Sequence, residues 1–453
     1  MPFRGHVNEL TLPAIAILVS VVLWALSILW QLSKIGRRPA NHPPGPPTLP
    51  LIGNLHQIPR EKRHLQFGKW AREYGPVYSL MLGAKVMIVL SSDLAMKELV
   101  DKRGLIYSSR PQAYIGQDIL SGGLRVLFMP NHDVWKMARK MAHRLLNVSA
   151  ARTYVPYQDL ENKAMLVGFL ESPGDFIDHL RRYAASLTTQ MTFGFRTTSI
   201  HNPEFKEAFD IFDRSSELIG SRPCVCVDLI KQQKEVRFSD ELAAYLSGSL
   251  LQAGSETTSS ILVGFIQAMI IFPDVAKTAQ QELDRVCGER MPDLNDVPNL
   301  PAVHNDSERH PNPRQFEPSR YMGDDQTSID AANNPDAAQR DHFVFGAGRR
   351  KCQGMHIADR SLFLAISRLL WAFDFQRPVN RETGREIIPD MDDLAEGVMM
   401  LPKPFEAKIS PRSASKAESI RQEWAQLESL LDEQAQWKTV PEGLIWKDEQ
   451  DIE

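Results

Sequence analysis

The stretch FGAGRRKCQG, residues 345–354, places a single cysteine, Cys352, among glycines and basic residues. Glycines permit tight turns and close approach of the backbone, and basic neighbours lower the pKa of a thiol by favouring its anion. A helix predicted to begin just after Cys352 would favour negative charge at its amino end as well. The stretch therefore predicts a stabilised thiolate held by a rigid loop. The neighbours concerned are Gly346, Gly348, Gly354, Arg349, Arg350 and Lys351.

A thiolate in such a loop could act as a nucleophile or as a metal ligand. The other cysteines are Cys224, Cys226 and Cys287, so Cys352 has no Cys-x-x-Cys partner, and no histidine is obviously placed as its base. A single axial thiolate on haem iron fits best. The pair Cys224-Val-Cys226 lacks the two-residue gap of zinc pairs, and we interpret it as structural or incidental. Four cysteines in 453 residues indicate a reducing compartment rather than a disulfide framework.

A second stretch that could take part in chemistry, AGSETT at residues 253–258, lies in the middle of the longest predicted helix, 239–272. Gly254 is costly inside a helix, and Glu256 and Thr257 bring polar groups into an apolar stretch. Two interpretations are open. The segment is either part of a buried helix with satisfied hydroxyls, or a helix that opens locally beside a ligand, because a threonine can bond backward to the preceding turn.

The elements that would position these stretches are mostly helices. Residues 77–92 alternate in polarity and predict a hairpin that turns at Gly83-Ala84. From Glu418 onward, an acidic tail carries apolar residues at helical spacing and predicts an appended amphipathic helix. The fold class is therefore mainly α with a small β portion. The predicted helices span residues 62–74, 92–102, 132–146, 155–171, 175–193, 204–219, 240–272, 274–287 and 353–371.

An uncharged apolar run near the N-terminus, residues 10–32, is long enough to cross a bilayer as a helix. A cleavable secretory signal would have a shorter apolar region and a small-residue cleavage site. Lys34, Arg37 and Arg38 follow the run, whereas only Arg4 clearly precedes it. The positive-inside rule then predicts a single-pass anchor with the rest of the chain in the cytoplasm.

The segment after the anchor, residues 33–50, is basic and rich in proline, so it predicts a stiff linker that orients the domain on the membrane surface. In the cytoplasm, the sequons at Asn147 and Asn305 should stay unglycosylated. The formal net charge of −4 gives no sign of a surface for nucleic acid, and we expect no nucleic-acid partner.

Several motifs together resemble one family. Phe345-x-x-Gly348-x-Arg350-x-Cys352-x-Gly354 matches the haem-binding signature of the cytochrome P450 family at every fixed position. Ala253-Gly254-x-Glu256-Thr257 resembles the family's oxygen-activating motif. Trp135-x-x-x-Arg139 resembles the pair that meets the haem propionates. Phe316-x-Pro318-x-Arg320-Tyr321 resembles the segment upstream of the haem loop. The chain resembles the microsomal, fungal-type members over about residues 10–410, and the tail at 411–453 falls outside.

The resemblance implies a mainly helical P450-like domain at 51–410 that binds haem b. The implied haem contacts are Cys352, the axial ligand of the iron; Trp135, Arg139 and Arg350, partners of the propionates; and Phe345, Gly346, Gly348, Gly354, Ala253 and Gly254, close to the ring.

The resemblance also implies the reaction and its partners. Thr257 would hold the oxygen and a water, and Glu256 would relay protons. A loop at residues 110–125, including Tyr114, Ile115 and Leu120, would lie near an apolar small-molecule substrate, and the fungal-type resemblance implies a secondary metabolite. Electrons would come from NADPH through a membrane-bound NADPH-cytochrome P450 reductase. The expected location is the endoplasmic reticulum membrane.

The sequence departs from the family in two places. The family has a Glu-x-x-Arg motif, on a helix before the haem loop, that pairs with an arginine corresponding to Arg320. Glu282-Leu-Asp-Arg285 has the spacing but directly follows the long helix, so we interpret it as a decoy. The motif helix is therefore expected to be missing near residue 303, and part of the substrate roof is expected to be missing near residue 220.

These departures leave three hypotheses. The chain is a monooxygenase whose true product is longer, or a truncated, non-catalytic membrane protein that binds haem poorly or not at all, or a haem-thiolate isomerase or dehydratase. The third is disfavoured because Glu256 beside Thr257 suits oxygen activation. The second is physically motivated, because an unpaired buried charge at Arg320 costs roughly 3–5 kcal/mol.

Overall fold

The computed structural model describes residues 12–199, 224–299, 328–334, 343–395 and 401–439. The chain divides into two compact units, Met1–Glu98 and Leu99–Glu453. The predicted helix at 204–219, the sequon at Asn305 and the motif around Arg320 lie outside the described residues.

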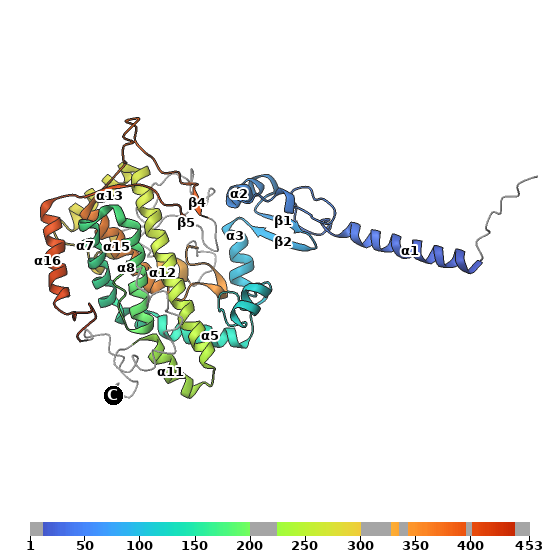
Figure 1. Cartoon of the computed structure of the whole chain (residues 1–453), viewed down its shortest axis with the longest axis horizontal. Helices are drawn as coiled ribbons and strands as arrows, with labels where there is room; N and C mark the ends of the chain where they lie inside the picture. The colour runs from blue at the N-terminus through green and yellow to red at the C-terminus, as the bar shows by residue number, and fades with distance from the viewer. Residues whose placement is uncertain (1–11, 200–223, 300–327, 335–342, 396–400, 440–453) are drawn as a thin grey trace, which may run out of the picture. The chain divides into compact units, whose positions relative to one another are not determined.

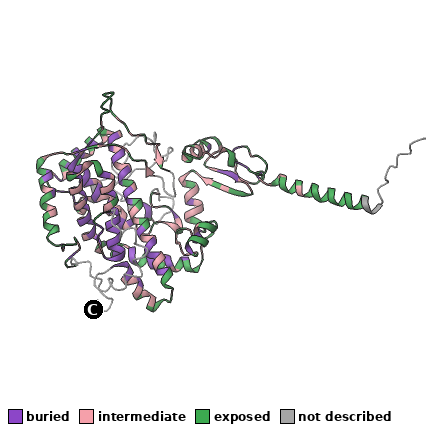
Figure 2. Ribbon diagram, in the orientation of Figure 1, coloured by how far each residue is buried: buried purple, intermediate pink, exposed green. Residues whose placement is uncertain are grey.

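The first unit begins with α1 (Leu12–Lys34), whose described residues are largely exposed along the helix (Figure 2). Within the described part of the chain, α1 is the helix that is by itself long and apolar enough to cross a membrane. A short 3₁₀ helix, η1 (Leu55–Gln57), α2 (Arg63–Tyr74) and α3 (Asp93–Met96) follow. Strands β1 (Val77–Leu82) and β2 (Lys85–Leu90) pair as an antiparallel hairpin, with Leu82 opposite Lys85 across the predicted turn.

The linker after α1 is bonded to the hairpin rather than free. Arg38 donates Nε to Ser79 Oγ (2.8 Å) and Nη1 to the Gly45 carbonyl (2.8 Å), and its Nη2 donates to the carbonyls of Pro46 (2.8 Å) and Ser79 (3.0 Å). Asn54 donates Nδ2 to the Pro46 and Pro47 carbonyls. The proline-rich segment therefore has a fixed place against β1, as a stiff linker requires.

The second unit is mostly helical (Figure 1). A π-helix, η2 (Lys97–Lys102), crosses the division between the units. The elements that follow are α4 (Gly104–Tyr107), η3 (Tyr114–Ile119), α5 (Asp133–Leu146), α6 (Val148–Thr153), α7 (Val155–Glu171), η4 (Pro173–Asp175), α8 (Phe176–Phe193), α11 (Val225–Glu235), α12 (Asp240–Ile271), α13 (Pro273–Val286), η6 (Leu294–Asn299), α14 (Ser328–Asn333), η8 (Gly348–Arg350), α15 (Met355–Ala372), β3 (Phe373–Gln376), β4 (Leu394–Ala395), β5 (Leu401–Pro402), β6 (Lys408–Pro411) and α16 (Ala414–Glu428).

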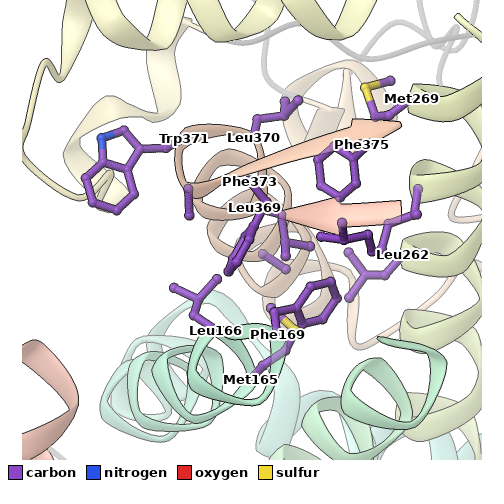
Figure 3. Close-up of a cluster of buried hydrophobic side chains, with 14 of the residues drawn as sticks. Met165, Leu166, Phe169, Leu262, Met269, Leu369, Leu370, Trp371, Phe373 and Phe375 are labelled. Atoms are coloured by element: carbon purple, nitrogen blue, oxygen red, sulfur yellow. The ribbon is translucent and has the colours of Figure 1, made fainter. Parts of the chain in front are cut away.

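The main core forms where α15 passes into β3. Phe373 and Phe375 of β3 point into a cluster with Phe169 of α7 and Leu262 of α12 (Figure 3). Strand β3 pairs antiparallel with β6, with Phe375 opposite Ile409. Apolar side chains from elements far apart in the sequence thus hold α15, which follows the cysteine loop, against the central helix α12.

The C-terminal segment packs on the second unit beside α7 (Figure 1). Ser413 caps α16 by accepting the Lys416 N–H, and Ile420 of α16 is fully buried. Beyond the helix, Trp437 is buried and lies 6.2 Å from the ring of Tyr157 on α7. Residues after the last strand therefore contribute to the core.

Most predicted helices lie within one or two residues of the observed ones, which is the usual uncertainty of helix ends. Ser239 caps α12 by accepting the Leu242 N–H, and Pro273 begins α13. Asn147 uses its side chain to cap α6, where it accepts the Ala150 N–H at 3.0 Å. The mainly α fold with a small β portion is confirmed, whereas the helices α4, α6, α11 and α14 were not predicted.

Candidate functional site

The cysteine loop is held by its own backbone. The Cys352 N–H donates to the Phe345 carbonyl at 2.8 Å, which closes the loop, and Gly346 adopts a φ of +74°. Helix α15 begins at Met355 with Gly354 as its N-cap. The Cys352 side chain is exposed. The loop therefore presents one accessible thiol just before the amino end of a helix, as the sequence predicts.

The structure explains why residue 348 is a glycine. Its φ is +62°, and a Cβ built on it would lie 2.2 Å from the Val100 carbonyl oxygen of η2. Its N–H donates to Asp101 Oδ1 at 2.6 Å. The close approach that this glycine permits is thus to the backbone of η2, and a larger residue would push the loop away. Asp101 was not predicted from the sequence, because no local pattern marks a carboxylate whose partner is so distant in the chain.

Two arginines of the predicted set lie near the ring of Trp135. The guanidinium carbon of Arg350 is 4.1 Å from the Trp135 ring centroid, and that of Arg139 is 5.9 Å from it. His132 caps α5 and accepts the Trp135 N–H at 3.2 Å, which fixes the start of the helix that carries both Trp135 and Arg139. Trp135, Arg139 and Arg350 therefore lie close together. Their role as partners of one anionic group stays a prediction.

Both arginines also bind the protein backbone. Arg139 donates Nη2 to the Lys351 carbonyl at 2.7 Å, next to the cysteine. Arg350 donates Nε to the Ser108 carbonyl (2.7 Å) and Nη2 to the Met129 carbonyl (2.6 Å). Burial lowers the pKa of Arg350 to about 10, and Arg110 and Arg139 contribute in the same direction. The arginines thus tie the cysteine loop to α5 and to the segment before it.

Gln353 makes the same connection from the loop side, because its Nε2 donates to the Arg139 carbonyl at 2.5 Å. Gln353 was not predicted from the sequence. Its position directly after Cys352 was the only signal that could have drawn attention to it.

The expected lowering of the Cys352 pKa is wrong for the polypeptide alone. Although Cys352 is exposed at the surface of its loop, the protein atoms packed around the sulfur partly desolvate it and raise the pKa of the thiol, and the Gly354 N–H and Arg139 offset only part of this rise. The basic neighbours have other partners. Arg350 points to the carbonyls described above, and Lys351 donates Nζ to the Ala332 carbonyl and to Asn333 Oδ1. A thiolate at Cys352 therefore needs stabilisation from a positive group beyond these side chains, such as a metal ion.

The stretch AGSETT lies in the middle of α12, which is a continuous α-helix. Thr257 donates its hydroxyl to the Ala253 carbonyl at 2.5 Å, which is the backward bond that the sequence analysis considered. Ala253, Glu256 and Thr257 are exposed, although residues on the other side of the same helix are buried. A central helix that exposes one stripe of its middle turns has a face on which a ligand could lie.

Gly254 belongs to a different side of α12. A Cβ built on it would lie 2.9 Å from Thr188 Oγ1 of α8. Its small size therefore permits close packing of α8 against α12, and this packing gives it a role apart from any ligand.

The segment before α5 carries several exposed apolar side chains. Tyr114 and Ile115 begin η3, Leu120 follows it, and all three are more than half exposed. Tyr245 of α12 donates its hydroxyl to the Leu120 carbonyl at 3.4 Å. These apolar groups lie on the segment that the sequence analysis placed near a substrate.

The residues present fit a haem. The accessible thiol of Cys352 is the soft ligand that its iron takes, Arg139 and Arg350 supply positive charge for propionates, and Gly354 would admit a Cβ without meeting any atom within 4 Å. Within the described ranges, no group of three or more His, Cys, Asp or Glu side chains is placed to hold a metal ion. The chemistry of the site thus agrees with a single axial thiolate.

The remaining cysteines and the decoy motif lie elsewhere. Cys224 and Cys226 are buried, and burial raises the pKa of their thiols to about 11 and about 12. Cys226 donates to Ser247 Oγ at 3.3 Å. Glu282 and Arg285 form an exposed pair on α13, with 3.2 Å between Oε1 and Nη2. These positions agree with the structural and decoy interpretations.

The sequence model of one family, described as Cytochrome P450, matches three parts of the chain, residues 43–231, 227–303 and 297–409. The two junctions between these parts lie beside the positions, near 220 and 303, where the sequence analysis expects missing segments.

Curated relatives agree with this match. The chain is 53% identical to the cytochrome P450 monooxygenase virE of Hypocrea virens, in an alignment covering 93% of the chain and 94% of the relative. It is 52% identical to the cytochrome P450 monooxygenase fogE of Aspergillus ruber, with 95% of the chain and 98% of the relative covered. These alignments run over 519 and 529 positions, more than the 453 residues of the chain, so each relative has residues opposite gaps in this chain.

Solved structures agree at the level of the fold. A zebra fish cytochrome P450 determined with abiraterone is 20% identical, with a TM-score of 0.60, and the match covers 77% of this chain and all of that one. Another structure, described as zebra fish cytochrome P450 with progesterone, has a TM-score of 0.61 and the same identity.

Proposed function

Because the chain belongs to the cytochrome P450 family, we propose that it is a haem-thiolate monooxygenase that inserts one atom of O₂ into an apolar small molecule. The observation that carries the proposal is the accessible thiol of Cys352 at the end of a loop that Arg139 and Gln353 tie to α5. The fungal monooxygenases among its relatives support the reaction, and a substrate from secondary metabolism is the corresponding expectation.

Haem b, when bound, would supply the activation of dioxygen, with the second oxygen atom leaving as water. Cys352 would ligate its iron, and Trp135, Arg139 and Arg350 would hold its propionates. The ring would lie near Phe345, Gly346 and Gly354 of the cysteine loop and near Ala253 of α12, whereas Gly348 and Gly254 serve the close packing described above.

The protein's own contribution to catalysis is placement and proton transfer. The Thr257 hydroxyl, exposed on α12, would orient a water beside the reacting atoms, and the Glu256 carboxylate would deliver protons from solvent. The exposed apolar side chains of Tyr114, Ile115 and Leu120 would bind and orient an apolar substrate.

Electrons would come from NADPH through a cytochrome P450 reductase. The candidate membrane helix α1 supports anchoring to the endoplasmic reticulum, with the catalytic unit facing the cytoplasm. Lys34 and Arg37, both exposed where α1 ends, favour that orientation.

The first test is the carbon monoxide difference spectrum of the reduced full chain. We expect the band of a thiolate-ligated haem, its loss in Cys352→Ser, and its retention in Cys287→Ser, which alters a cysteine remote from the loop in sequence. Absence of the band in the unchanged chain would overturn the proposal. With the band present, NADPH, reductase and candidate apolar substrates would then be tested for a product heavier by one oxygen atom.

A second candidate function is that of a non-catalytic membrane protein derived from this family. The three-part match of the family model and the gaps in both alignments favour it, because the expected Glu-x-x-Arg helix would fall in such a gap. In this case the unchanged chain binds little haem, and insertion of a Glu-x-x-Arg segment between Val303 and His304 restores the band.

A further inference from the structure

We propose that Arg125 and Gln252 form a polar subsite that binds a carboxylate of the substrate, so that the small molecule this chain takes is an apolar acid. The inference rests on the monooxygenase function proposed above and narrows its substrate class. Neither residue belongs to the haem contacts or to the proton path assigned above.

The pair joins the two elements that the proposed function places beside the substrate. Arg125 is the last residue of the loop at 110–125. Gln252 directly precedes Ala253 in the middle of α12 and is exposed. Arg125 Nη2 donates to Gln252 Oε1 at 2.6 Å, which connects the loop to the helix that carries Thr257.

The charge of Arg125 has no acidic partner within the described ranges. Its bond to Gln252 goes to a neutral amide, and its Nε and Nη1 atoms have no acceptor among the described residues. Glu256 lies one turn further along α12, but no ion pair joins it to Arg125 in the described chain. A half-buried cation without a counter-ion, beside a face on which a ligand could lie, gains most from an anionic ligand.

Packing and hydrogen bonds hold Arg125 in place. Its neighbours Leu124 and Val126 pack in a buried cluster with Met129. The Arg125 carbonyl accepts the N–H of Phe128 at 3.0 Å and that of Met129 at 3.1 Å, which closes a turn. The guanidinium carbon lies 5.5 Å from the Phe128 ring centroid. The cation is therefore pre-organised, which lowers the entropy lost when a ligand binds.

The segment that carries Arg125 is bonded to both parts of the proposed haem site. The Met129 carbonyl, at the end of the turn, accepts Arg350 Nη2 of the cysteine loop at 2.6 Å. On the other side, Tyr245 of α12 donates its hydroxyl to the Leu120 carbonyl at 3.4 Å. A ligand group bound at Arg125 would thus lie close to the site and not on a remote surface.

The exposed stripe of α12 leads from this subsite to the proposed point of reaction. Thr257 follows Gln252 by five residues, which is about 7.5 Å of helical rise. Between them, the side chains of Ile119 and Leu120 are 61% and 71% exposed on the loop and offer apolar contact. An acid held at Gln252 would therefore lay its apolar body along the stripe, with a carbon remote from the carboxylate beside Thr257.

A carboxylate matches the available donors. Arg125 still offers Nε and Nη1, and Gln252 Nε2 has no acceptor within the described part of the chain. The planar fork of an arginine binds a planar carboxylate through two parallel hydrogen bonds, and such charge-assisted bonds are stronger than neutral ones. A primary amide of the same shape carries no charge and turns N–H groups toward these donors, so it should bind less well.

The test is equilibrium dialysis of the full chain in detergent micelles, with protein-free micelles as the blank. The probes are para-hexylbenzoate and its neutral isostere para-hexylbenzamide. We expect the acid to bind about tenfold more tightly than the amide at neutral pH, as a charge-assisted hydrogen bond supplies. Equal affinities, tighter binding of the amide, or no saturable binding of either probe would overturn the proposal.

Variants of the arginine test its part. Arg125→Gln should lose the preference for the acid and keep its affinity for the amide. Arg125→Lys keeps a charge without the planar fork, so it should retain part of the preference. Arg285→Gln, which alters an exposed arginine of α13, is the matched control and should keep the whole preference. Equal loss in Arg125→Gln and Arg285→Gln would overturn the proposal.

Gln252→Glu separates a binding role from a structural one. The new carboxylate would pair with Arg125 and repel the acid, so the preference for the acid should disappear although Arg125 is intact. If the bond merely joined the loop to α12, the substitution would keep or strengthen it and leave the preference unchanged. A retained preference in Gln252→Glu would therefore overturn the subsite.

Dialysis does not require haem, so the two proposals can fail separately. A chain that shows the carbon monoxide band but no preference for the acid overturns this subsite alone. A chain without the band, but with a preference that depends on Arg125, overturns the proposed reaction and leaves the acid-binding subsite in place. With the band present, the acid should also shift the spectrum of the ferric haem, and Arg125→Gln should need more acid for the same shift.

Discussion

The indole N–H of Trp437 donates to the side-chain oxygen of Gln190 on α8 at 2.9 Å. The amide nitrogen of the same Gln190 donates to Glu161 on α7 at 2.7 Å. A residue near the end of the described chain thereby completes a buried polar network between two central helices. Next to this network, Arg196 and Gln436 are joined by two hydrogen bonds. The Arg196 N–H donates to Gln436 Oε1 at 2.7 Å, and Gln436 Nε2 donates to the Arg196 carbonyl at 3.0 Å.

Trp437→Ala should destabilise the second unit by roughly 3–5 kcal/mol, because the substitution removes a large buried side chain and leaves Gln190 without its donor. Trp437→Phe should cost less, because it keeps a ring beside Tyr157. Urea denaturation of the full chain in detergent measures both. Leu430→Ala, at an exposed position of the same segment, is the control. Equal stability of the Trp437→Ala variant and the control would show that the segment is not part of the folded unit.

Glu161→Gln should destabilise the protein by about 3–5 kcal/mol, because it leaves the buried Arg196 and the half-buried Arg182 without their charge partner. Glu161 is fully buried, and its carboxylate oxygens lie 2.5 Å from Arg182 Nη1 and Arg196 Nε. Burial acts to raise its pKa, but Arg196 and Arg182 together outweigh burial and lower it. The control is Glu282→Gln in an exposed pair, for which roughly 0–1 kcal/mol is expected.

The pH dependence of Glu161 has a definite sign. A carboxylate whose folded pKa lies below its unfolded pKa contributes stability above the unfolded pKa and loses that contribution as the pH falls through the folded one. The stability difference between the wild-type protein and Glu161→Gln should therefore be full at neutral pH and shrink in acid. A difference that grows on acidification would contradict the assigned ionised state.

Gly254→Ala should destabilise the protein by about 1–3 kcal/mol, because the new methyl group would meet Thr188 Oγ1 at 2.9 Å and Cγ2 at 3.1 Å. Thr188→Ala removes both atoms, so the double variant should recover most of the loss. Gly264→Ala, on the same helix with its nearest atom at 3.9 Å, should be neutral or stabilising by roughly 0.5–1 kcal/mol. Thermal unfolding measures the stability of each variant. If the losses in Gly254→Ala and Thr188→Ala simply add in the double variant, the contact with Thr188 is not the cause of the destabilisation.

Arg350→Lys should lower the haem content of the purified protein, whereas Arg349→Lys should not. A lysine can place one charge but cannot reach the Ser108 and Met129 carbonyls from a planar fork as Arg350 does. Arg349 is exposed in the same loop and is the matched control. Haem per polypeptide, from the pyridine haemochrome assay, is the measurement, and equal occupancy in the two variants would contradict the role of the fork.

Asp284→Asn should lower stability at neutral pH by less than about 1 kcal/mol, since the Asp284 side chain is 42% exposed and solvent screens its ion pairs. Hydrogen bonding from Arg412, opposed by burial and reinforced by Lys416, lowers the pKa of Asp284 to about 2. The stability difference between the wild-type protein and Asp284→Asn should be present above the ordinary pKa of aspartate and should fade as the pH falls toward 2. Melting temperatures of the two proteins across this pH range, at low salt, provide the test.

The helices could be predicted from the sequence because their signals are local. Ser239, Pro273 and the apolar spacing between them specify α12 without reference to the rest of the chain. Two short motifs, the haem signature around Cys352 and the separate Trp135-x-x-x-Arg139 match, pointed to these residues through the resemblance to one family. The structure brings these three residues together through the bond from Arg139 to the Lys351 carbonyl.

The sequence could not show which distant residues each side chain contacts in the folded protein. Its basic residues made the cysteine loop look suited to a thiolate, but Lys351 turns to Asn333 and Arg350 turns to Ser108, so their charges do not stabilise the sulfur. Gly254 belongs to a motif that suggests ligand approach, whereas its tight neighbour is Thr188 of α8. Such distinctions depend on packing between distant segments, which spacing along the chain does not encode.

The hydrogen bonds of Arg38 to the linker and to β1 limit where the chain can be shortened for production without its membrane helix. A version beginning at Pro39 would lose the bonds to Gly45, Pro46 and Ser79, and one beginning after Ile35 would lose the acceptor of the Leu51 N–H. The last residues of the anchor are thus also the first residues of the folded unit. A soluble variant would keep Ile35–Arg38 intact and replace only the lipid-spanning residues before them.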